Sequence, residues 1–231
     1  MAEPTGNDAT DSSACCRPTL PDPRIQGYFD RKVRRQTTAG HVFAMLPASR
    51  RLLAELTDVG AARPTVLELG CGPGSLTLAL LERGAARATG IDLSPQSVEV
   101  ADRRAREAGV ADRVEFRVGD AASLALETHD WVVLDKVICC YRDLDALLTS
   151  SIAAAGRRYV FVVPDSRGVR GLLGRALVWL ENATNMLRGR PCPGYVHDIR
   201  VIEGRLEAAG FRRASRATFR LWYLAVFDRA A

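Results

Sequence analysis

The stretch VLELGCGPGSL, residues 66–76, decides the fold of this chain. Its first residues predict an apolar strand, and the glycine-rich turn that follows opens a helix at Ser75. Because glycine has no Cβ, backbone N–H groups at such a turn approach a ligand closely. The stretch therefore predicts a binding loop between a strand and a helix.

The spacing of the glycines separates this loop from a phosphate-binding loop. Gly70, Gly72 and Gly74 give G-x-G-x-G, whereas dinucleotide-binding loops read G-x-G-x-x-G. Glu68 stands two residues before the first glycine, where a carboxylate repels pyrophosphate and attracts an ammonium or sulfonium group. Any tight strand-to-helix turn also recruits glycine, so the loop alone does not identify its ligand.

Apolar runs alternate with amphipathic stretches along the chain, which predicts a doubly wound parallel sheet with right-handed crossovers. Two runs near the end, 211–217 and 221–227, are joined by only 218–220, too short for a crossover helix, so we expect an antiparallel hairpin. The fold class is thus α/β and Rossmann-like, mostly parallel with an antiparallel C-terminal hairpin strand. The other expected strands are 65–69, 88–92, 114–118, 131–135 and 158–163, and the expected helices are 74–83, 94–109, 143–155 and 199–209.

Two more acids follow the next two strands. Asp92 ends the strand of GIDLS (residues 90–94), about 20 residues after the loop, where a carboxylate accepts hydrogen bonds from both ribose hydroxyls. Asp120, in VGDA (residues 118–121), is placed to accept an adenine amino group while the backbone of Ala121 donates. In the alternative, Asp120 caps the helix that follows.

ELGCGPG (68–74), GIDLS and VGDA, in this order and at these spacings, resemble the class I S-adenosylmethionine-dependent methyltransferases. The resemblance covers roughly residues 63–163 and the closing hairpin, and it implies a seven-stranded sheet whose last strand is reversed. It implies S-adenosylmethionine as the cofactor. The expected contacts are Gly70, Cys71, Gly72 and Gly74 around the methionine part, Glu68 near its ammonium group, Asp92 at the ribose, and Asp120 and Ala121 at the adenine, with Leu93 and Lys136 as further cofactor contacts.

The loop DKVICCYRD, residues 135–143, is expected to face the transferred methyl group, because ligands lie beyond the carboxyl ends of the strands. It lacks the Asn/Asp-Pro-Pro-Tyr/Phe pattern of amino-directed nucleic-acid methyltransferases. Tyr28 and Tyr141 look like the magnesium-protoporphyrin O-methyltransferase and ubiquinone/menaquinone branch, but Cys140 stands where the porphyrin enzymes have a histidine. We expect Cys139 and Cys140 to be small buried apolar residues and not nucleophiles.

The sequence predicts a disordered tail at 1–23 and one domain at 24–231, with a helical cap at 24–62 and a lid insertion at 166–195. A helix expected between residues 41 and 56 is interrupted by Pro47. The lid carries one apolar stripe, for which three interpretations are open. The stripe lines the acceptor site, or it packs against the sheet, or, as a lesser alternative, it lies on a membrane surface. Tyr28, Tyr141 and His197 are the candidates for orienting the acceptor or removing its proton, since histidine titrates near neutral pH.

The 231 residues carry a formal charge of +5, and 47% are hydrophobic. We expect a cytoplasmic methyltransferase that acts on an oxygen or carbon of a moderately hydrophobic small molecule, without a metal or a spanning helix. Interleaved charges favour a solvated surface over a nucleic-acid partner. The rivals are an RNA methyltransferase that uses the basic residues 31–35, a nicotinamide oxidoreductase and a non-catalytic S-adenosylmethionine-binding protein. The oligomeric state is left open.

Overall fold

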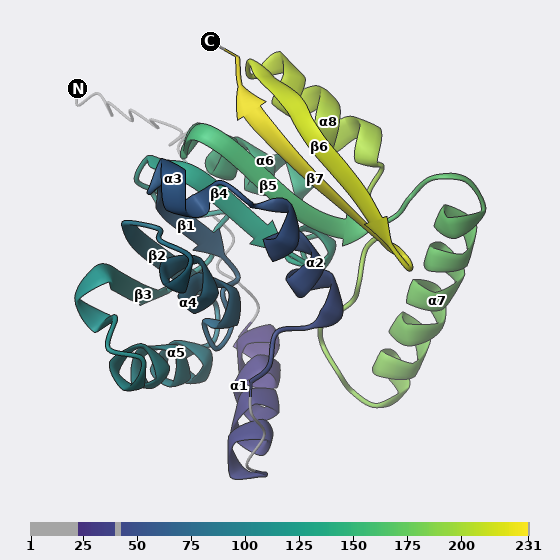
Figure 1. Cartoon of the computed structure of the whole chain (residues 1–231). Helices are drawn as coiled ribbons and strands as arrows, with labels where there is room; N and C mark the ends of the chain where they lie inside the picture. The colour runs from purple at the N-terminus through teal and green to yellow at the C-terminus, as the bar shows by residue number, and fades with distance from the viewer. Residues whose placement is uncertain (1–22, 40–42, 231) are drawn as a thin grey trace, which may run out of the picture.

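A computed structural model describes residues 23–39 and 43–230 (Figure 1). Its centre is a seven-stranded sheet with the order β3-β2-β1-β4-β5-β7-β6. Strands β1 to β5 run parallel, and β7 pairs antiparallel with both β5 and β6. The predicted Rossmann-like fold with a reversed C-terminal strand is therefore confirmed. The strands are β1 (Thr65–Leu69), β2 (Arg87–Asp92), β3 (Val114–Val118), β4 (His129–Asp135), β5 (Ala155–Pro164), β6 (Phe211–Phe219) and β7 (Trp222–Arg229).

Helices cover both faces of the sheet, which explains why the central strands are apolar on both sides. One face packs against α2, α4 and α5, and the other packs against α6 and α8. Helices α1 and α7 lie outside these two layers (Figure 1). The helices are α1 (Pro23–Thr38), α2 (Pro47–Glu55), α3 (Val59–Ala62), α4 (Ser75–Glu82), α5 (Pro95–Glu107), α6 (Leu144–Ala153), α7 (Gly168–Leu187) and α8 (Ile199–Ala208), with short 3-10 turns at Ala111–Arg113 and Ile138–Cys140.

The register of the parallel strands brings the candidate residues to one edge of the sheet. Glu68 on β1 lies opposite Gly90 on β2 and opposite Val133 on β4. The strands therefore end side by side, and the loops after β1, β2 and β4 meet at the carboxyl edge. This is the edge at which doubly wound sheets bind their ligands.

The helix expected between residues 41 and 56 begins later than the apolar pattern suggests. The structure shows helix only from Pro47, and Leu46 before it is extended at φ −65° and ψ 155°. A residue that precedes proline avoids the helical region, while proline itself fits the first helical position. Residues 41–42 and most of the predicted tail, residues 1–22, lie outside the described residues.

The lid stripe does not pack against the sheet, so that alternative is wrong. Leu172 is 67% exposed and Leu180 is 53% exposed, and both lie on the outer side of α7. Glycines occupy the side that faces the body, where Gly171 and Gly174 are buried. Periodicity identified the helix correctly, but it did not reveal which face is turned inward.

Candidate active site

The glycine-rich loop adopts a backbone that only glycine accommodates easily. Gly70 has φ +71°, and a Cβ there would lie 2.2 Å from Cγ2 of Val137. Its N–H donates to the carbonyl of Ile91 at 2.7 Å, which ties the loop to β2. Gly72 has φ +52°, but a Cβ there would meet nothing within 4 Å. Gly70 therefore allows the chain to pack closely, whereas Gly72 leaves open space.

That open space belongs to a cavity of about 520 Å³, here called the glycine-loop cavity. Volumes of roughly 300–1,000 Å³ are typical of small-ligand sites. Most of the expected cofactor contacts line it, but Gly74 and Asp120 do not. The predicted residues on its wall are Glu68, Gly70, Cys71, Gly72, Asp92, Leu93, Ala121, Lys136 and Tyr141.

Glu68 is the buried acid of this cavity. Its side chain accepts a short hydrogen bond from the hydroxyl of Thr77 on α4, and the residue is only 3% exposed. Burial raises the pKa of Glu68 to about 8, and the nearby charge of Asp135 adds to the rise. A cationic ligand group beside Glu68, such as the ammonium group expected from the sequence, would favour the ionised form.

Asp92 holds the glycine loop as well as the cavity wall. One carboxylate oxygen accepts from the N–H of Gly72 at 2.8 Å, and the other accepts from the N–H of Ser94 at 2.9 Å. Burial raises the pKa of Asp92, although these two hydrogen bonds oppose the rise. Each carboxylate oxygen has lone pairs left, so the group retains the capacity to accept from a ribose.

Asp135, at the end of β4, is the site residue that the sequence analysis missed. Its Oδ2 accepts from the hydroxyl of Ser49 and from Nζ of Lys136, both at 2.5 Å. Its Oδ1 is buried and has no hydrogen-bond partner among the described residues. A buried carboxylate oxygen without a donor is costly, and Asp135 lines the glycine-loop cavity. The arrangement fits a bound ligand that supplies a hydrogen-bond donor.

Lys136 has a strained backbone beside this acid. Its φ of 62° is uncommon for a residue with a side chain. The turn directs Nζ to the hydroxyl of Ser49 at 2.5 Å and to Asp135. Strain of this kind is found at functional sites, and here it places a cation in the wall of the cavity. In the sequence, the only sign of the Asp135–Lys136 pair is that charged residues stand at the end of a buried strand.

Asp120, Tyr141 and His197 form one hydrogen-bonded chain. The hydroxyl of Tyr141 donates to Oδ1 of Asp120 at 2.6 Å, and that oxygen also accepts from the N–H of Ala122 at 3.0 Å. Burial raises the pKa of the Tyr141 phenol well above its ordinary value. Nε2 of His197 lies 2.8 Å from the carbonyl oxygen of Tyr141, so it donates there. His197 lines neither the glycine-loop cavity nor its neighbour described next.

A second cavity of about 430 Å³, here called the α7 cavity, adjoins the first. It lies between α1, the Cys139–Cys140 turn and the inner side of α7, and Tyr28 is part of its wall. Phe29, Lys32 and Cys140 line both cavities. The two cavities therefore meet at these shared residues, and Tyr28 lines the α7 cavity.

The cysteines of the loop are less buried than expected. Cys140 is exposed and Cys139 is half-buried, so the expectation that both are buried is wrong. The Cys139 thiol donates to the carbonyl of Lys136 at 3.2 Å. Its hydrogen bond to the Cys140 thiol raises the pKa of Cys140 to about 12. A thiol with a raised pKa is a poor nucleophile, in keeping with the non-nucleophilic role expected for this pair.

The chain resembles known proteins in sequence and in fold. Residues 66–158 match a family model described as a methyltransferase domain. Residues 66–158 are thus similar in sequence to methyltransferase domains, and the chain has the fold of the class I S-adenosylmethionine-dependent methyltransferases. A ribosomal protein L11 methyltransferase of Escherichia coli is 32% identical to it over 128 residues, which is 55% of this chain and 39% of that protein. The chain thus matches less than half the length of this relative.

Solved structures resemble the fold of most of this chain. The magnesium protoporphyrin IX methyltransferase of Synechocystis with bound S-adenosylhomocysteine has a TM-score of 0.68 at 20% identity, over 90% of this chain and 100% of that one. The geranyl diphosphate C-methyltransferase of Streptomyces coelicolor has a TM-score of 0.62 at 16% identity, over 92% and 100%. At these identities the likeness shows the fold.

Proposed function

We propose that this methyltransferase moves a methyl group from S-adenosylmethionine, held in the glycine-loop cavity, to an oxygen or carbon of a moderately hydrophobic small molecule held in the α7 cavity. The observation that carries the proposal is the junction of the two cavities at Phe29, Lys32 and Cys140. The small-molecule neighbours named above support it, since their acceptors are a porphyrin and a prenyl diphosphate.

The residues of the glycine-loop cavity fit the cofactor. Bound there, S-adenosylmethionine would supply a methyl group on a sulfonium, which is a good leaving group. Glu68 and Oδ1 of Asp135, which has no partner in the part of the chain that the structure describes, would accept hydrogen bonds from its ammonium group. Asp92 would accept from the ribose, and the space beside Gly72 leaves room for the ligand.

The chain contributes position more than covalent chemistry. Holding the acceptor in line with the methyl group and away from water supplies most of the rate enhancement in such a transfer. Tyr28, which lines the α7 cavity, would orient the acceptor. Tyr141 and His197 would act as positioning residues, because the Tyr141 hydroxyl is held by Asp120 and His197 is bonded to the Tyr141 backbone.

Transfer of tritium from methyl-labelled S-adenosylmethionine tests the proposal. The purified protein is incubated with a lipophilic small-molecule extract, with total RNA or with ribosomal protein, and the labelled fraction is identified. We expect label in the lipophilic extract. Label confined to RNA or protein would contradict the proposal.

A pair of matched variants tests the acceptor cavity itself. Val178 is half-buried and lines the α7 cavity, so Val178→Trp fills that space. Val201 on α8 is 48% exposed, and Val201→Trp makes the same change away from the cavity. We expect Val178→Trp to lower kcat/KM for the acceptor at least tenfold while the affinity for S-adenosylhomocysteine is unchanged, in the range typical of a blocked pocket. Equal effects of the two variants would rule out the α7 cavity as the acceptor site.

A further inference from the structure

The outer face of α7 is the most apolar exposed surface of the described chain. Eight of the twelve large apolar side chains that are exposed among the described residues belong to this one helix. They recur at helical spacing and form a continuous stripe, here called the outer face. Its members are Val169 (73% exposed), Leu172 (67%), Leu173 (53%), Leu177 (51%), Trp179 (72%), Leu180 (53%), Met186 (76%) and Leu187 (84%).

The orientation of α7 is fixed by contacts on its inner side. A Cβ on Gly171 would lie 2.3 Å from the carbonyl oxygen of Ser166, so the helix packs there as closely as glycine allows. Asn182 exchanges two hydrogen bonds with the backbone of Gly194, at 2.9 and 2.7 Å. The small and polar residues thus face the body, and most of the large apolar ones face outward. Leu177 lies at the border, because it is 51% exposed and also lines the α7 cavity.

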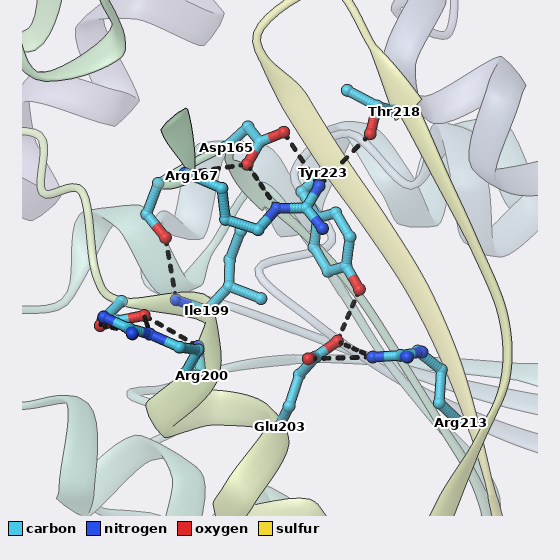
Figure 2. Close-up of polar contacts among 10 residues, drawn as sticks. Asp165, Arg167, Ile199, Arg200, Glu203, Arg213, Thr218 and Tyr223 are labelled. Carbon is cyan, nitrogen blue, oxygen red and sulfur yellow. Dashed lines mark hydrogen bonds and ion pairs between the residues drawn. The ribbon is translucent and has the colours of Figure 1, made fainter. Parts of the chain in front are cut away.

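Polar contacts also anchor the beginning of α7 (Figure 2). Arg167 forms a two-pronged ion pair with Asp165, and its guanidinium lies 4.2 Å from the ring centre of Tyr223. The Tyr223 hydroxyl donates to Glu203 on α8 at 2.5 Å, and the N–H of Ile199 donates to Ser166 at 3.0 Å. The outer face is therefore carried by a helix that is firmly joined to the hairpin and to α8.

A strongly basic hollow, here called the basic pocket, adjoins the end of this helix. Its wall contains five cations, three from α1 and two from the turn directly after α7, and no acidic residue among the described ones. None of these five forms an ion pair within the described part of the chain, so their charge is available to a partner. They are Arg31, Lys32, Arg35, Arg188 and Arg190.

We propose that the outer face and the basic pocket dock the protein on an anionic phospholipid membrane, with α7 lying in the plane of the interface. Exposed apolar side chains, a tryptophan and flanking arginines are the features by which a helix inserts between headgroups and attracts anionic lipid. No helix within the described residues is long and apolar enough to cross a membrane. A second copy of this chain would bring its own five cations to the contact, whereas an anionic bilayer supplies the opposite charge.

Docking of this kind gives the α7 cavity a position relative to the membrane. Gly174, Leu177 and Val178 come from α7 and line that cavity, so the cavity lies directly behind the docked helix. A lipid-dissolved acceptor would then enter without crossing water. The docking itself does not depend on the proposed methyl transfer, and each is measured without the other.

Vesicle flotation of the full-length protein tests the proposal. Vesicles of phosphatidylcholine alone are compared with vesicles that contain about 30% phosphatidylglycerol. The apolar variant is Leu172→Glu with Trp179→Glu, neither of which lines a cavity described above, and its control is Val201→Glu on α8. The charge variant is Arg188→Glu with Arg190→Glu, and its control, Arg87→Glu with Arg106→Glu, makes the same change of net charge elsewhere.

We expect the wild type and both controls to float with the anionic vesicles, and both test variants to lose at least about tenfold in partitioning. Circular dichroism and S-adenosylhomocysteine binding show that the variants are folded. Failure of the wild type to float with anionic vesicles would overturn the proposal. Two other results would also overturn it. One is a wild-type dimer in sedimentation analysis that is lost in the apolar variant, and the other is displacement of the protein from the vesicles by RNA.

Discussion

Substitution of Glu68 by glutamine isolates the electrostatic contribution of the cofactor site. Glutamine keeps the size of the side chain and the bond to Thr77, but it removes the titration. Burial raises the pKa of Glu68 to about 8, so only about a tenth of the free protein carries the ionised group at pH 7. A ligand ammonium binds the ionised form, and binding at pH 7 must therefore expel a proton from most molecules.

The size of the effect follows from that pKa. Between pH 6 and pH 7 the ionised fraction of Glu68 rises about tenfold, which is about 1.4 kcal/mol of binding free energy. The wild-type affinity should therefore rise about tenfold over this range and peak near pH 8, where the ligand's own amino group begins to lose its proton. Glu68→Gln should show less than about a twofold change between pH 6 and pH 7.

Calorimetric titration with S-adenosylhomocysteine measures both quantities. Repeating the titration in buffers of different ionisation enthalpy counts the protons released, and we expect close to one for the wild type at pH 7 and none for Glu68→Gln. Parallel pH profiles for the two proteins, or no proton release by the wild type, would show that Glu68 does not pair with the ligand's ammonium group.

The same pKa predicts the stability of the unliganded protein. The folded state holds the Glu68 proton up to about pH 8, while the unfolded chain releases it near 4.5. The stabilising preference for the protonated form is thus complete below about pH 4.5 and is lost as the pH rises to 8. At pH 8 the free energy of unfolding of Glu68→Gln, measured in urea, should therefore exceed that of the wild type by up to roughly 5 kcal/mol. At pH 4.5 the two proteins should differ little.

Three further substitutions test neighbouring parts of the structure. Asp135→Asn should weaken S-adenosylhomocysteine binding about tenfold in calorimetry, because the carboxylate loses its charge, whereas Ser49→Ala should weaken it less than about threefold. Equal affinity of Asp135→Asn and the wild type would show that Asp135 does not contact the ligand. Tyr141→Phe should lower the turnover of labelled cofactor by less than about tenfold with an unchanged pH profile, since the phenol stays protonated. A loss above about 100-fold with a shifted pH profile would show that Tyr141 transfers a proton. Arg158→Met should lower the free energy of unfolding, measured in urea, by about 2 kcal/mol. Arg158 forms hydrogen-bonded ion pairs with Asp58 at 2.7 Å and Asp228 at 2.6 Å, and its guanidinium lies over the ring of Trp131. No measurable change would show that these ion pairs do not stabilise the fold.

The sequence predicted the strands well because their patterns are local. Short apolar runs, glycine turns and the three-residue link within the hairpin each follow from a few neighbouring residues. The hairpin turn itself is tighter than expected, since β6 continues to Phe219 and β7 begins at Trp222, with Arg220 at φ 55°.

Features that depend on distant contacts were not accessible in the same way. The hydrogen bonding of Asp135 involves Ser49 in α2, which donates to Oδ2 and lies 86 residues away in the chain. Asp120 and Tyr141 were each expected at a ligand, yet their strongest contact is with each other. The outward turn of α7 depends on Ser166 and Gly194, which periodicity within the helix does not include.

One calorimetric comparison shows whether S-adenosylmethionine binds beside the glycine loop. Gly72 and Gly109 both have positive φ, +52° and +67°, and a Cβ on either meets nothing within 4 Å. Valine at each position therefore imposes the same kind of backbone strain, of about 1–2 kcal/mol, without a clash inside the protein. We predict that Gly72→Val abolishes S-adenosylhomocysteine binding while Gly109→Val binds like the wild type. Undiminished binding by Gly72→Val would contradict the account.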